Sequence, residues 1–271
     1  MPHALLQSNI ATFKALHQQG RLLLPNAWDG MSVRMAQQCG AQALATTSAG
    51  IAWALGMQDG HRARRKQIMQ YLHIILSGCA LPVSVDIEDG LLQEGESMAD
   101  LAADLLALSC AGVNLEDSRQ GRSLPLEEGA ARIAALRAAV GALDYPLFIN
   151  ARIDAWLRGE TRAAQDLIAR ANAYFAAGAD CVFMPGLLDL DVIRTVAASI
   201  DGPLSVMARP GGPDAAALFA AGACRVSAGS FFPEQAYSMT QREMADFMRD
   251  GSLQAQFAPA ISYADLNAVL A

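Results

Sequence analysis

The stretch LPVSVDIEDG, residues 81–90, passes from an apolar run directly into a cluster of acidic side chains. Residues 81–85 are apolar or small, and so short a run bounded by turn residues predicts a buried strand. Asp86 and Glu88 follow two residues apart, so on an extended backbone both side chains leave the same face. Two carboxylates at the end of a buried strand repel each other unless a proton or a cation lies between them.

Carboxylate oxygens at this density suit a hard divalent cation, Mg²⁺ or Mn²⁺ as its substitute. The plainer alternative is a solvated loop whose acidic residues cap the helix that follows. The stretch alone leaves both interpretations open, and the rest of the chain is needed to choose between them.

Eight β-rich runs recur along the chain, each followed by a polar or Gly-containing loop and, in most cases, by an Ala/Leu-rich helical pattern. They lie at 22–26, 43–48, 82–88, 112–117, 147–153, 181–186, 204–209 and 225–229. Strands that alternate with helices indicate parallel βαβ units. A doubly wound open sheet would need a Gly-rich phosphate-binding turn after the first strand, and residues 25–30 lack one. We therefore predict an α/β fold, the (β/α)8 barrel.

The 271 residues fit one such barrel, and no Pro/Ser-rich linker or run of charges divides them. We expect a single domain over residues 1–271, with a helical extension from about residue 232. Within the extension, residues 235–249 have a helical pattern with Met239, Met244 and Met248 on one stripe. A Met-rich stripe of this kind is typical of core packing or subunit contact.

Composition excludes several classes of protein. The net charge of −7 argues against binding to nucleic acid, which requires a basic face. No apolar run approaches membrane-spanning length, and the N-terminus lacks the pattern of a secretion signal. The five cysteines form no Cys-x-x-Cys pair and indicate free thiols in a reducing compartment. We expect a soluble, cytoplasmic protein without nucleic-acid or membrane partners, and its four histidines make a zinc site or a Ser-His-Asp triad improbable.

Catalytic residues of such barrels come from the carboxyl ends of the strands and the following loops. Acidic residues gather after the second, third and fourth predicted strands, where Asp59, Asp86, Glu88 and Glu116 could hold one octahedral Mg²⁺, partly through waters. On the fifth strand, Arg152 lies in an apolar run and would be costly to bury without an anion.

Two anions could satisfy Arg152. One is a protein carboxylate, either Asp154 or an acid of the metal site. The other is a small substrate carboxylate, held bidentately by the guanidinium while its other end reaches the metal. Ser48 and Gly50 could add a hydroxyl and backbone donors to the same anion, although Ser-Ala-Gly alone is also an ordinary strand-to-helix turn.

Taken together, these residues resemble the isocitrate lyase/phosphoenolpyruvate mutase superfamily, and the short phosphoenolpyruvate mutase-like members most closely. The resemblance covers residues 20–235 approximately, in unbroken order. Its motifs are LPNAWD (24–29), TSAG (47–50), LGxxDG (55–60), VDIEDG (85–90), NLEDS (114–118), NARxD (150–154), GADxVFxPG (178–186) and RVSxG (225–229).

The resemblance implies an (α/β)8 barrel whose eighth helix is exchanged between subunits, in dimers that pair into tetramers. It implies Mg²⁺ at Asp86, Glu88 and Glu116, with Asp59 in the outer shell and in a catalytic role. It also implies a 2-oxo acid or its enolate, with Ser48 and Arg152 as catalytic and binding residues. The remaining predicted substrate contacts are Ala49, Gly50, Asn150 and Arg209.

The loop after the fourth strand departs from the family pattern. Lyases of the family carry Lys-Lys-Cys-Gly-His there, with the Cys as acid/base, whereas residues 117–124 read DSRQGRSL. The Asn and Lys of the mutase-type loop are also absent, and Arg119 and Arg122 are the candidates to replace them. The same loop, with Gly121 as a hinge, is hypothesised to close over the site.

Because decarboxylation demands least of that loop, we expect a Mg²⁺-dependent lyase or carboxy-lyase that breaks a bond to C3 of a 2-oxo acid. One alternative is a phosphoenolpyruvate phosphonomutase or phosphonopyruvate hydrolase, for which Arg119, Arg122 and Arg209 would converge on a dianion. Another is a barrel that binds a 2-oxo acid without turnover.

Overall fold

The computed structural model describes residues 3–60, 64–119, 121–253 and 261–270. Its main sheet is a ring of parallel strands in the order β1-β11-β10-β9-β8-β5-β4-β3-β2. These strands are β1 (Leu22–Leu24), β2 (Asn26–Ala27), β3 (Leu44–Thr46), β4 (Val83–Asp86), β5 (Gly112–Glu116), β8 (Phe148–Arg152), β9 (Cys181–Phe183), β10 (Leu204–Met207) and β11 (Ala223–Ser227). They coincide with the eight predicted strands, because β1 and β2 are two halves of the first.

Pro25 divides that first strand and explains how the ring closes. A proline has no N–H for a sheet ladder, so the strand breaks there. Before the break β1 pairs with β11, and after it β2 pairs with β3. The Asn26 side chain joins the two edges: its Oδ1 accepts from the backbone N–H of Ala228 and Gly229, and its Nδ2 donates to the Thr46 carbonyl. The predicted (β/α)8 barrel is confirmed.

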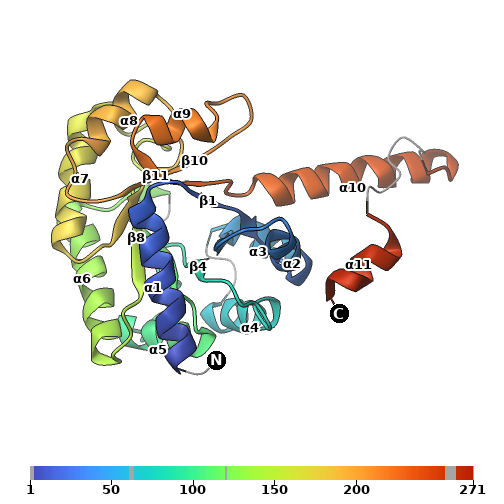
Figure 1. The fold of residues 1–271 in the computed structure, drawn as a ribbon, viewed down its shortest axis with the longest axis horizontal. Coiled ribbons are helices and arrows are strands. Elements are labelled where there is room, and N and C mark those ends of the chain that lie inside the picture. The colour runs from blue at the N-terminus through green and yellow to red at the C-terminus, as the bar shows by residue number, and fades with distance from the viewer. Residues whose placement is uncertain (1–2, 61–63, 120, 254–260, 271) are drawn as a thin grey trace.

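Helices surround the ring (Figure 1) and alternate with its strands along the chain, as the sequence predicted. Several begin at an acid or serine whose side chain accepts a backbone N–H of the first turn, as at Asp29, Ser97, Asp189 and Asp214. The helices are α1 (His3–Gln19), α2 (Gly30–Gln38), α4 (Arg65–Ile75), α5 (Met98–Leu108), α6 (Leu126–Ala142), α7 (Ala164–Ala176), α8 (Leu190–Ala197) and α9 (Ala215–Ala220).

Helix α1 closes the barrel at the amino ends of the strands. The ring of Phe13 packs edge-on against Phe148, the first residue of β8, with 5.1 Å between ring centroids. His17 lies 4.2 Å from the same ring. Gly112, the first residue of β5, leaves room for this packing, because a Cβ there would lie 3.0 Å from Phe13.

The C-terminal helix α10 (Phe231–Asp250) projects from the barrel (orange-red in Figure 1), and α11 (Tyr263–Leu270) follows it. The predicted extension and its helix at 235–249 agree with α10. Its exposed apolar side chains are Phe232, Tyr237, Met239, Met244, Phe247 and Met248. Exchange of this helix between subunits stays a prediction, as does the assignment of the whole chain to one domain.

Two elements near the barrel mouth differ from expectation. The second strand ends at Thr46, and Ser48 begins the short helix α3 (Ser48–Ala54) instead of ending the strand. After β5, the strands β6 (Ser118–Arg119) and β7 (Arg122–Ser123) form a small antiparallel hairpin. In the described parts of the chain, every helix is too short or too polar to cross a membrane.

Candidate active site

A cavity of about 650 Å³ opens at the carboxyl ends of β4, β5 and β8. It is lined by Ser48, Asp59, Gly60, Glu88, Asp89, Leu92, Glu116, Arg119, Gly121, Arg152 and Arg158. A smaller cavity of about 170 Å³ shares Ser48, Asp59 and Arg152 with it and includes Ala49, Asp86 and Asn114. Most residues predicted from the sequence therefore meet at the expected end of the barrel.

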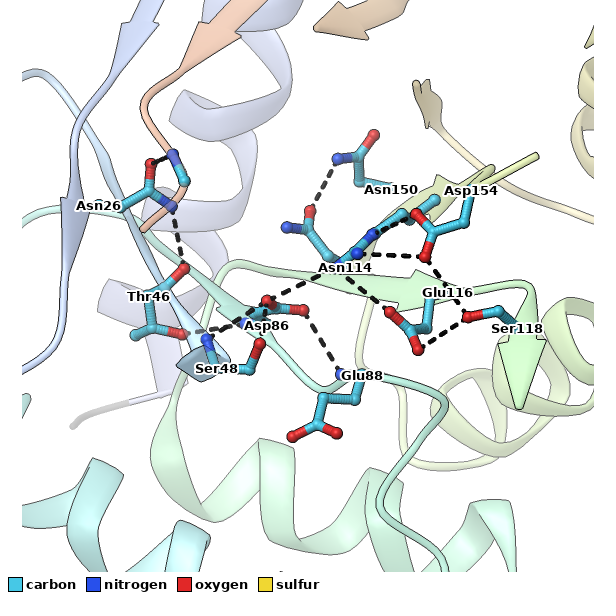
Figure 2. A network of polar contacts seen from close by, with 12 residues as sticks. Asn26, Thr46, Ser48, Asp86, Glu88, Asn114, Glu116, Ser118, Asn150 and Asp154 are labelled. Atoms are coloured by element: carbon cyan, nitrogen blue, oxygen red, sulfur yellow. Dashed lines mark hydrogen bonds and ion pairs between the residues drawn. The ribbon is translucent and has the colours of Figure 1, made fainter. Parts of the chain in front are cut away.

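Asp86, at the end of β4, is held by side chains of the neighbouring strand and helix (Figure 2). The Ser48 hydroxyl donates to Asp86 Oδ2 at 2.8 Å, and the backbone N–H of Ser48 lies 3.3 Å from the same oxygen. The Asp86 backbone N–H donates to Thr46 Oγ1 at 2.9 Å. These contacts fix the carboxylate and leave Oδ1 with a long contact, 3.4 Å, from the backbone N–H of Glu88.

Glu88 reaches the cavity through a turn, not along a strand. Strand β4 ends at Asp86, and Glu88 has φ +48°, in the left-handed region that disfavours side chains other than glycine. Such a conformation costs roughly 1–2 kcal/mol and is found preferentially at functional positions. The prediction that Asp86 and Glu88 leave the same face of an extended strand was therefore wrong, because the strand ends before Glu88. Glu88 nevertheless lines the cavity.

Arg152 lies among three carboxylates. Its Nε donates to Asp154 Oδ1 at 2.7 Å and its Nη2 to Asp154 Oδ2 at 3.1 Å. Its Nη1 faces Glu116 Oε2 at 3.2 Å and Asp86 Oδ2 at 4.0 Å. Burial alone would lower the pKa of Arg152, but the three carboxylates raise it above its usual value. The ion pair considered from the sequence is thus formed, while Nη1 remains directed towards the cavity acids.

Glu116, at the end of β5, is a mostly buried acid in a crowded negative environment. Burial raises its pKa to about 7; Arg152 opposes the rise, whereas the negative charges of Asp154 and Asp86 add to it. The Ser118 hydroxyl donates to Glu116 Oε1 at 3.0 Å. A cation next to Glu116 and Asp86 would offset this repulsion.

The acids fit a divalent cation by their chemistry and by their position. Asp86, Glu88 and Glu116 come from β4, the turn after it and β5 (Figure 2). Glu88 and Glu116 line the larger cavity, and Asp86 lines the smaller one. Within residues 3–60, 64–119, 121–253 and 261–270, no three His, Cys, Asp or Glu side chains are arranged as a ready cage for a metal. The fit to a divalent cation therefore rests on the hard carboxylate oxygens of these residues and on the negative charge that gathers at Glu116.

Behind the site, Asp117 supports the segment that carries Arg152. Its Oδ1 accepts the backbone N–H of Asp154 at 3.1 Å, and its Oδ2 accepts from Tyr174 at 2.8 Å and Arg170 at 3.1 Å. Asp117 follows Glu116 at the end of β5, but it is buried and lines neither cavity. The alternation of side chains along β5 explains this, because Glu116 takes the inward face and its neighbour the outward one.

Other predicted residues are placed as follows. Asn150 is buried inside the barrel and donates to Asn114 at 2.7 Å without lining either cavity. Gly50 is tightly packed, since a Cβ there would lie 2.7 Å from the Trp28 Cβ. Arg209 is exposed and lines neither cavity, so the contact predicted for it stays a prediction. His61, which follows Asp59 and Gly60 in the sequence, lies outside the described residues.

The sequence reasoning missed Arg158 and the cavity position of Asp89. Arg158 follows β8 in a loop, where a charged residue usually indicates only a solvated surface. Its Nη2 donates to Ser118 at 2.8 Å and contacts Asp154 Oδ2 at 3.4 Å. Arg119, by contrast, lines the cavity as considered, and its Nε lies 3.6 Å from Asp89.

Both the sequence and the fold of this chain are similar to those of known proteins. The sequence profile of the phosphoenolpyruvate phosphomutase family matches residues 13–248. An uncharacterized protein of Mycobacterium tuberculosis is 36% identical over 265 residues, which cover 96% of each chain. The 2-methylisocitrate lyase of Bacillus subtilis is 29% identical over 192 residues, covering 68% of this chain and 61% of the lyase.

A solved structure shares both sequence and fold with this chain. It is a provisionally assigned phosphonomutase from Burkholderia cenocepacia J2315, which superposes with a TM-score of 0.82 at 37% identity and covers 88% of this chain and 99% of its own. The named relatives are therefore lyases and mutases. The chain belongs to the phosphoenolpyruvate phosphomutase family, in the isocitrate lyase/phosphoenolpyruvate mutase superfamily, as its motifs predicted.

Proposed function

We propose that this protein is a lyase, most specifically a carboxy-lyase, that uses Mg²⁺ to break a bond to C3 of a small 2-oxo acid. The observation that carries the proposal is the Ser48–Asp86 hydrogen bond beside the Glu116–Arg152 ion pair, at two cavities that share Ser48 and Arg152. Carboxylate oxygens suited to a hard cation thus lie next to a guanidinium. A 2-oxo acid could bind such a cation through its carbonyl and the guanidinium through its carboxylate.

In this proposal Asp86, Glu88 and Glu116 would hold the cation, and Asp59 would act from its outer shell. When bound, the cation polarises the substrate carbonyl and stabilises negative charge that develops on it. Arg152 then binds the substrate carboxylate. Asp154 already fixes the plane of the guanidinium through two hydrogen bonds, so little side-chain freedom is lost when the substrate binds.

The Ser48 hydroxyl and the backbone N–H groups of Ala49 and Gly50 would donate hydrogen bonds to the same substrate carboxylate as Arg152. Ser48 begins α3, so these N–H groups lie at a helix start, where unpaired donors favour an anion. In the structure the Ser48 hydroxyl donates its hydrogen bond to Asp86. To donate to the substrate carboxylate instead, it would have to give up this hydrogen bond.

The hairpin after β5 favours decarboxylation over aldol-type cleavage. Residues 117–124 include no Cys, Lys or His that could transfer a proton. Loss of CO2 needs no base in the bond-breaking step, because the electrons of the C–C bond move towards the carbonyl. A water molecule can then protonate C3.

Phosphonate chemistry is the second candidate, as a phosphonomutase or a phosphonopyruvate hydrolase. The similarity to the Burkholderia cenocepacia protein favours it, since that protein is 37% identical. We also propose a homo-oligomer of paired dimers, supported by the exposed apolar side chains of α10 such as Met244, Phe247 and Met248.

The test is ¹H and ³¹P NMR of the purified protein with Mg²⁺ and a panel of substrates: oxaloacetate, its methyl-substituted forms, 2-methylisocitrate, phosphoenolpyruvate and phosphonopyruvate. Asp86→Asn is measured beside Asp201→Asn, an exposed acid in the loop before β10, and beside an EDTA-treated sample. Pyruvate or 2-oxobutyrate formed from an oxo-diacid, and lost with EDTA and with Asp86→Asn alone, supports the carboxy-lyase.

The other outcomes separate the alternatives. A new phosphorus signal would establish the mutase or hydrolase. If no compound is converted but one binds, the enzyme proposal fails, and a 2-oxo acid-binding protein without turnover takes its place.

A further inference from the structure

Two hydrogen bonds through Thr46 connect Asn26, where the ring of strands closes, to Asp86 at the barrel mouth (Figure 2). We propose that Thr46 is a positioning residue for the metal site: its hydroxyl fixes the backbone of Asp86, and Asn26 in turn fixes Thr46. Closure of the ring would then set the affinity of the site for a divalent cation. This inference rests on the cation ligands of the function proposed above and assigns two residues that support them.

Thr46 holds Asp86 where the ladder between β3 and β4 has ended. The last paired positions of these strands are Ala45 and Ser84. Two residues after Ser84, the backbone N–H of Asp86 donates to Thr46 Oγ1 at 2.9 Å, so a side chain takes the place of a strand carbonyl. Because Thr46 is fully buried, this hydrogen bond is shielded from competing water and fixes the end of β4.

Asn26 holds Thr46 by its carbonyl. The Asn26 Nδ2 donates to that oxygen at 3.1 Å, while its Oδ1 accepts the backbone N–H groups of Ala228 at 2.9 Å and Gly229 at 2.8 Å. Gly229 has φ +57°, and a Cβ there would clash with Met207 Sδ, so the turn that presents these N–H groups depends on glycine. One buried amide thus ties the turn after β11 to the end of β3.

The same segment also holds the Asp86 carboxylate. Ser48, two residues after Thr46, donates from its hydroxyl to Asp86 Oδ2 at 2.8 Å. Residues 46–48 therefore hold both the backbone and the carboxylate of Asp86, and a shift of this segment would move the carboxylate oxygens. Mg²⁺ demands near-ideal ligand geometry, so a small displacement weakens binding. Residues that support metal ligands in this way typically change metal affinity by about ten- to a hundredfold.

The test measures metal binding in the absence of substrate, by titration with Mn²⁺ followed by electron paramagnetic resonance. Thr46→Val keeps the branched shape of the side chain but removes the acceptor, and it should weaken Mn²⁺ binding about tenfold or more. Thr46→Ser keeps the hydroxyl and should retain most of the affinity.

Stability and hydrogen exchange separate positioning from a merely structural role. Both substitutions should lower the melting temperature, because Val leaves the Asp86 N–H without its acceptor and Ser leaves a methyl-sized void. Only Thr46→Val should weaken Mn²⁺ binding. Exchange of the Asp86 amide hydrogen, followed by NMR without metal, should likewise be faster in Thr46→Val than in Thr46→Ser or the wild type.

Further variants test the path and its specificity. Asn26→Ala should also weaken Mn²⁺ binding, and combined with Thr46→Val it should do so by less than the product of the two single effects. Ser205→Ala removes a buried hydroxyl of β10 that lines neither cavity, and it should leave the affinity unchanged. Asp86→Asn should abolish binding. If Asn26→Ala does not fold, the two Thr46 variants carry the test.

Equal Mn²⁺ affinity of Thr46→Val and the wild type would overturn the proposal, even with faster exchange at Asp86, because the hydrogen bond would then hold the strand without positioning a metal ligand. Equal losses in Thr46→Val and Thr46→Ser would overturn it too, as would absence of Mn²⁺ binding by the wild type. Failure of the proposed function is read separately, as the lack of any conversion in the substrate panel by a protein that binds Mn²⁺.

Discussion

Arg152 on β8 and Arg225 on β11 both lie inside the barrel, but their surroundings differ. Arg152, at the mouth, contacts Asp154 and Glu116 and borders both cavities. Arg225, deeper in the barrel, is fully buried, and its described hydrogen bond is to Asn114 Oδ1 at 3.2 Å. Within the described chain, its Nε and Nη1 atoms have no hydrogen-bond partner.

The two ends of the barrel interior thus shift the pKa of a buried arginine in opposite directions. At the mouth, carboxylates raise the pKa of Arg152, whereas burial lowers the pKa of Arg225. His17, on the helix that closes the floor, has its pKa lowered to about 3, first by burial and then by the charge of Arg225. At the mouth, Arg152 is paired with carboxylates and could exchange one of them for an anionic ligand. At the floor, the positive charge of Arg225 disfavours protonation of His17.

The largest effect is expected at the mouth, from Arg152→Met. Loss of the guanidinium removes the proposed carboxylate contact and leaves Asp154 and Glu116 without their main cation, so kcat/KM should fall about a hundred- to a thousandfold. Arg152→Lys should not restore activity, because an ammonium cannot reproduce the planar fork. Steady-state kinetics on the substrate identified by NMR measure this, and a variant with near wild-type kcat/KM would remove Arg152 from the site.

At the floor, His17 should make stability fall in mild acid. Its folded pKa lies below the unfolded value of 6.5, so its contribution is complete above pH 6.5 and is lost as the pH falls towards 3. Between pH 6.5 and 5 the loss is about 2 kcal/mol. Glu116 acts in the opposite direction over this range, because its folded pKa is raised.

Comparison of His17→Gln with the wild type cancels the contribution of Glu116. Urea unfolding at pH 6.5 and pH 5 should show that the variant loses about 2 kcal/mol less than the wild type. Parallel pH dependence of the two proteins would mean that His17 titrates normally in the folded state.

Tyr174→Phe tests the connection from the helix layer to the mouth. The change removes the hydrogen bond that Tyr174 donates to Asp117 and the one that it accepts from Arg170, but the contact between Arg170 and Asp117 remains. The free energy of unfolding should therefore fall by about 1–2 kcal/mol. Asp117 still accepts from the Asp154 backbone, and kcat should therefore fall only a few-fold. Chemical denaturation and kinetics measure the two effects, and a hundredfold loss of kcat would show that Tyr174 does more than position Asp117.

The smallest effect is expected from Arg225→Met, the counterpart of the change at Arg152. In the described part of the chain Arg225 has no ion pair with a carboxylate, and replacing such a buried charge by an apolar side chain of similar length is often neutral or stabilising. The free energy of unfolding at pH 8 should stay within about 1 kcal/mol of wild type or rise, and the pKa of His17 should increase. A loss of about 3 kcal/mol or more would show instead that the guanidinium is well compensated at the floor.

The eight strands, their parallel arrangement and the meeting of Asp86, Glu116 and Arg152 were predictable from local pattern. Alternating strands and helices leave few topologies, and in each of them the carboxyl ends of neighbouring strands meet at one edge. The family motifs were equally readable, because each keeps its spacing within one short segment. These features depend on near neighbours in the chain.

Side-chain direction beyond the end of a strand was not predictable in the same way. Glu88 faces the cavity through a left-handed residue, Asp117 turns outward to Tyr174, and Arg158 enters from a loop without a motif. The closure of the ring around Pro25 likewise depends on a pairing between residues about 200 positions apart.

The amino-acid sequence by itself thus determined the barrel, the family and the acids and arginine at its mouth, because periodicity and turn residues act over a few positions. Only the tertiary structure decided which carboxylate holds which guanidinium: Asp154 contacts both Arg152 and Arg158, whereas Arg225 forms no ion pair with a carboxylate among the residues that the structure describes. The physical reason is that ion pairing depends on distances across strands and loops, and these exist only once the ring has closed.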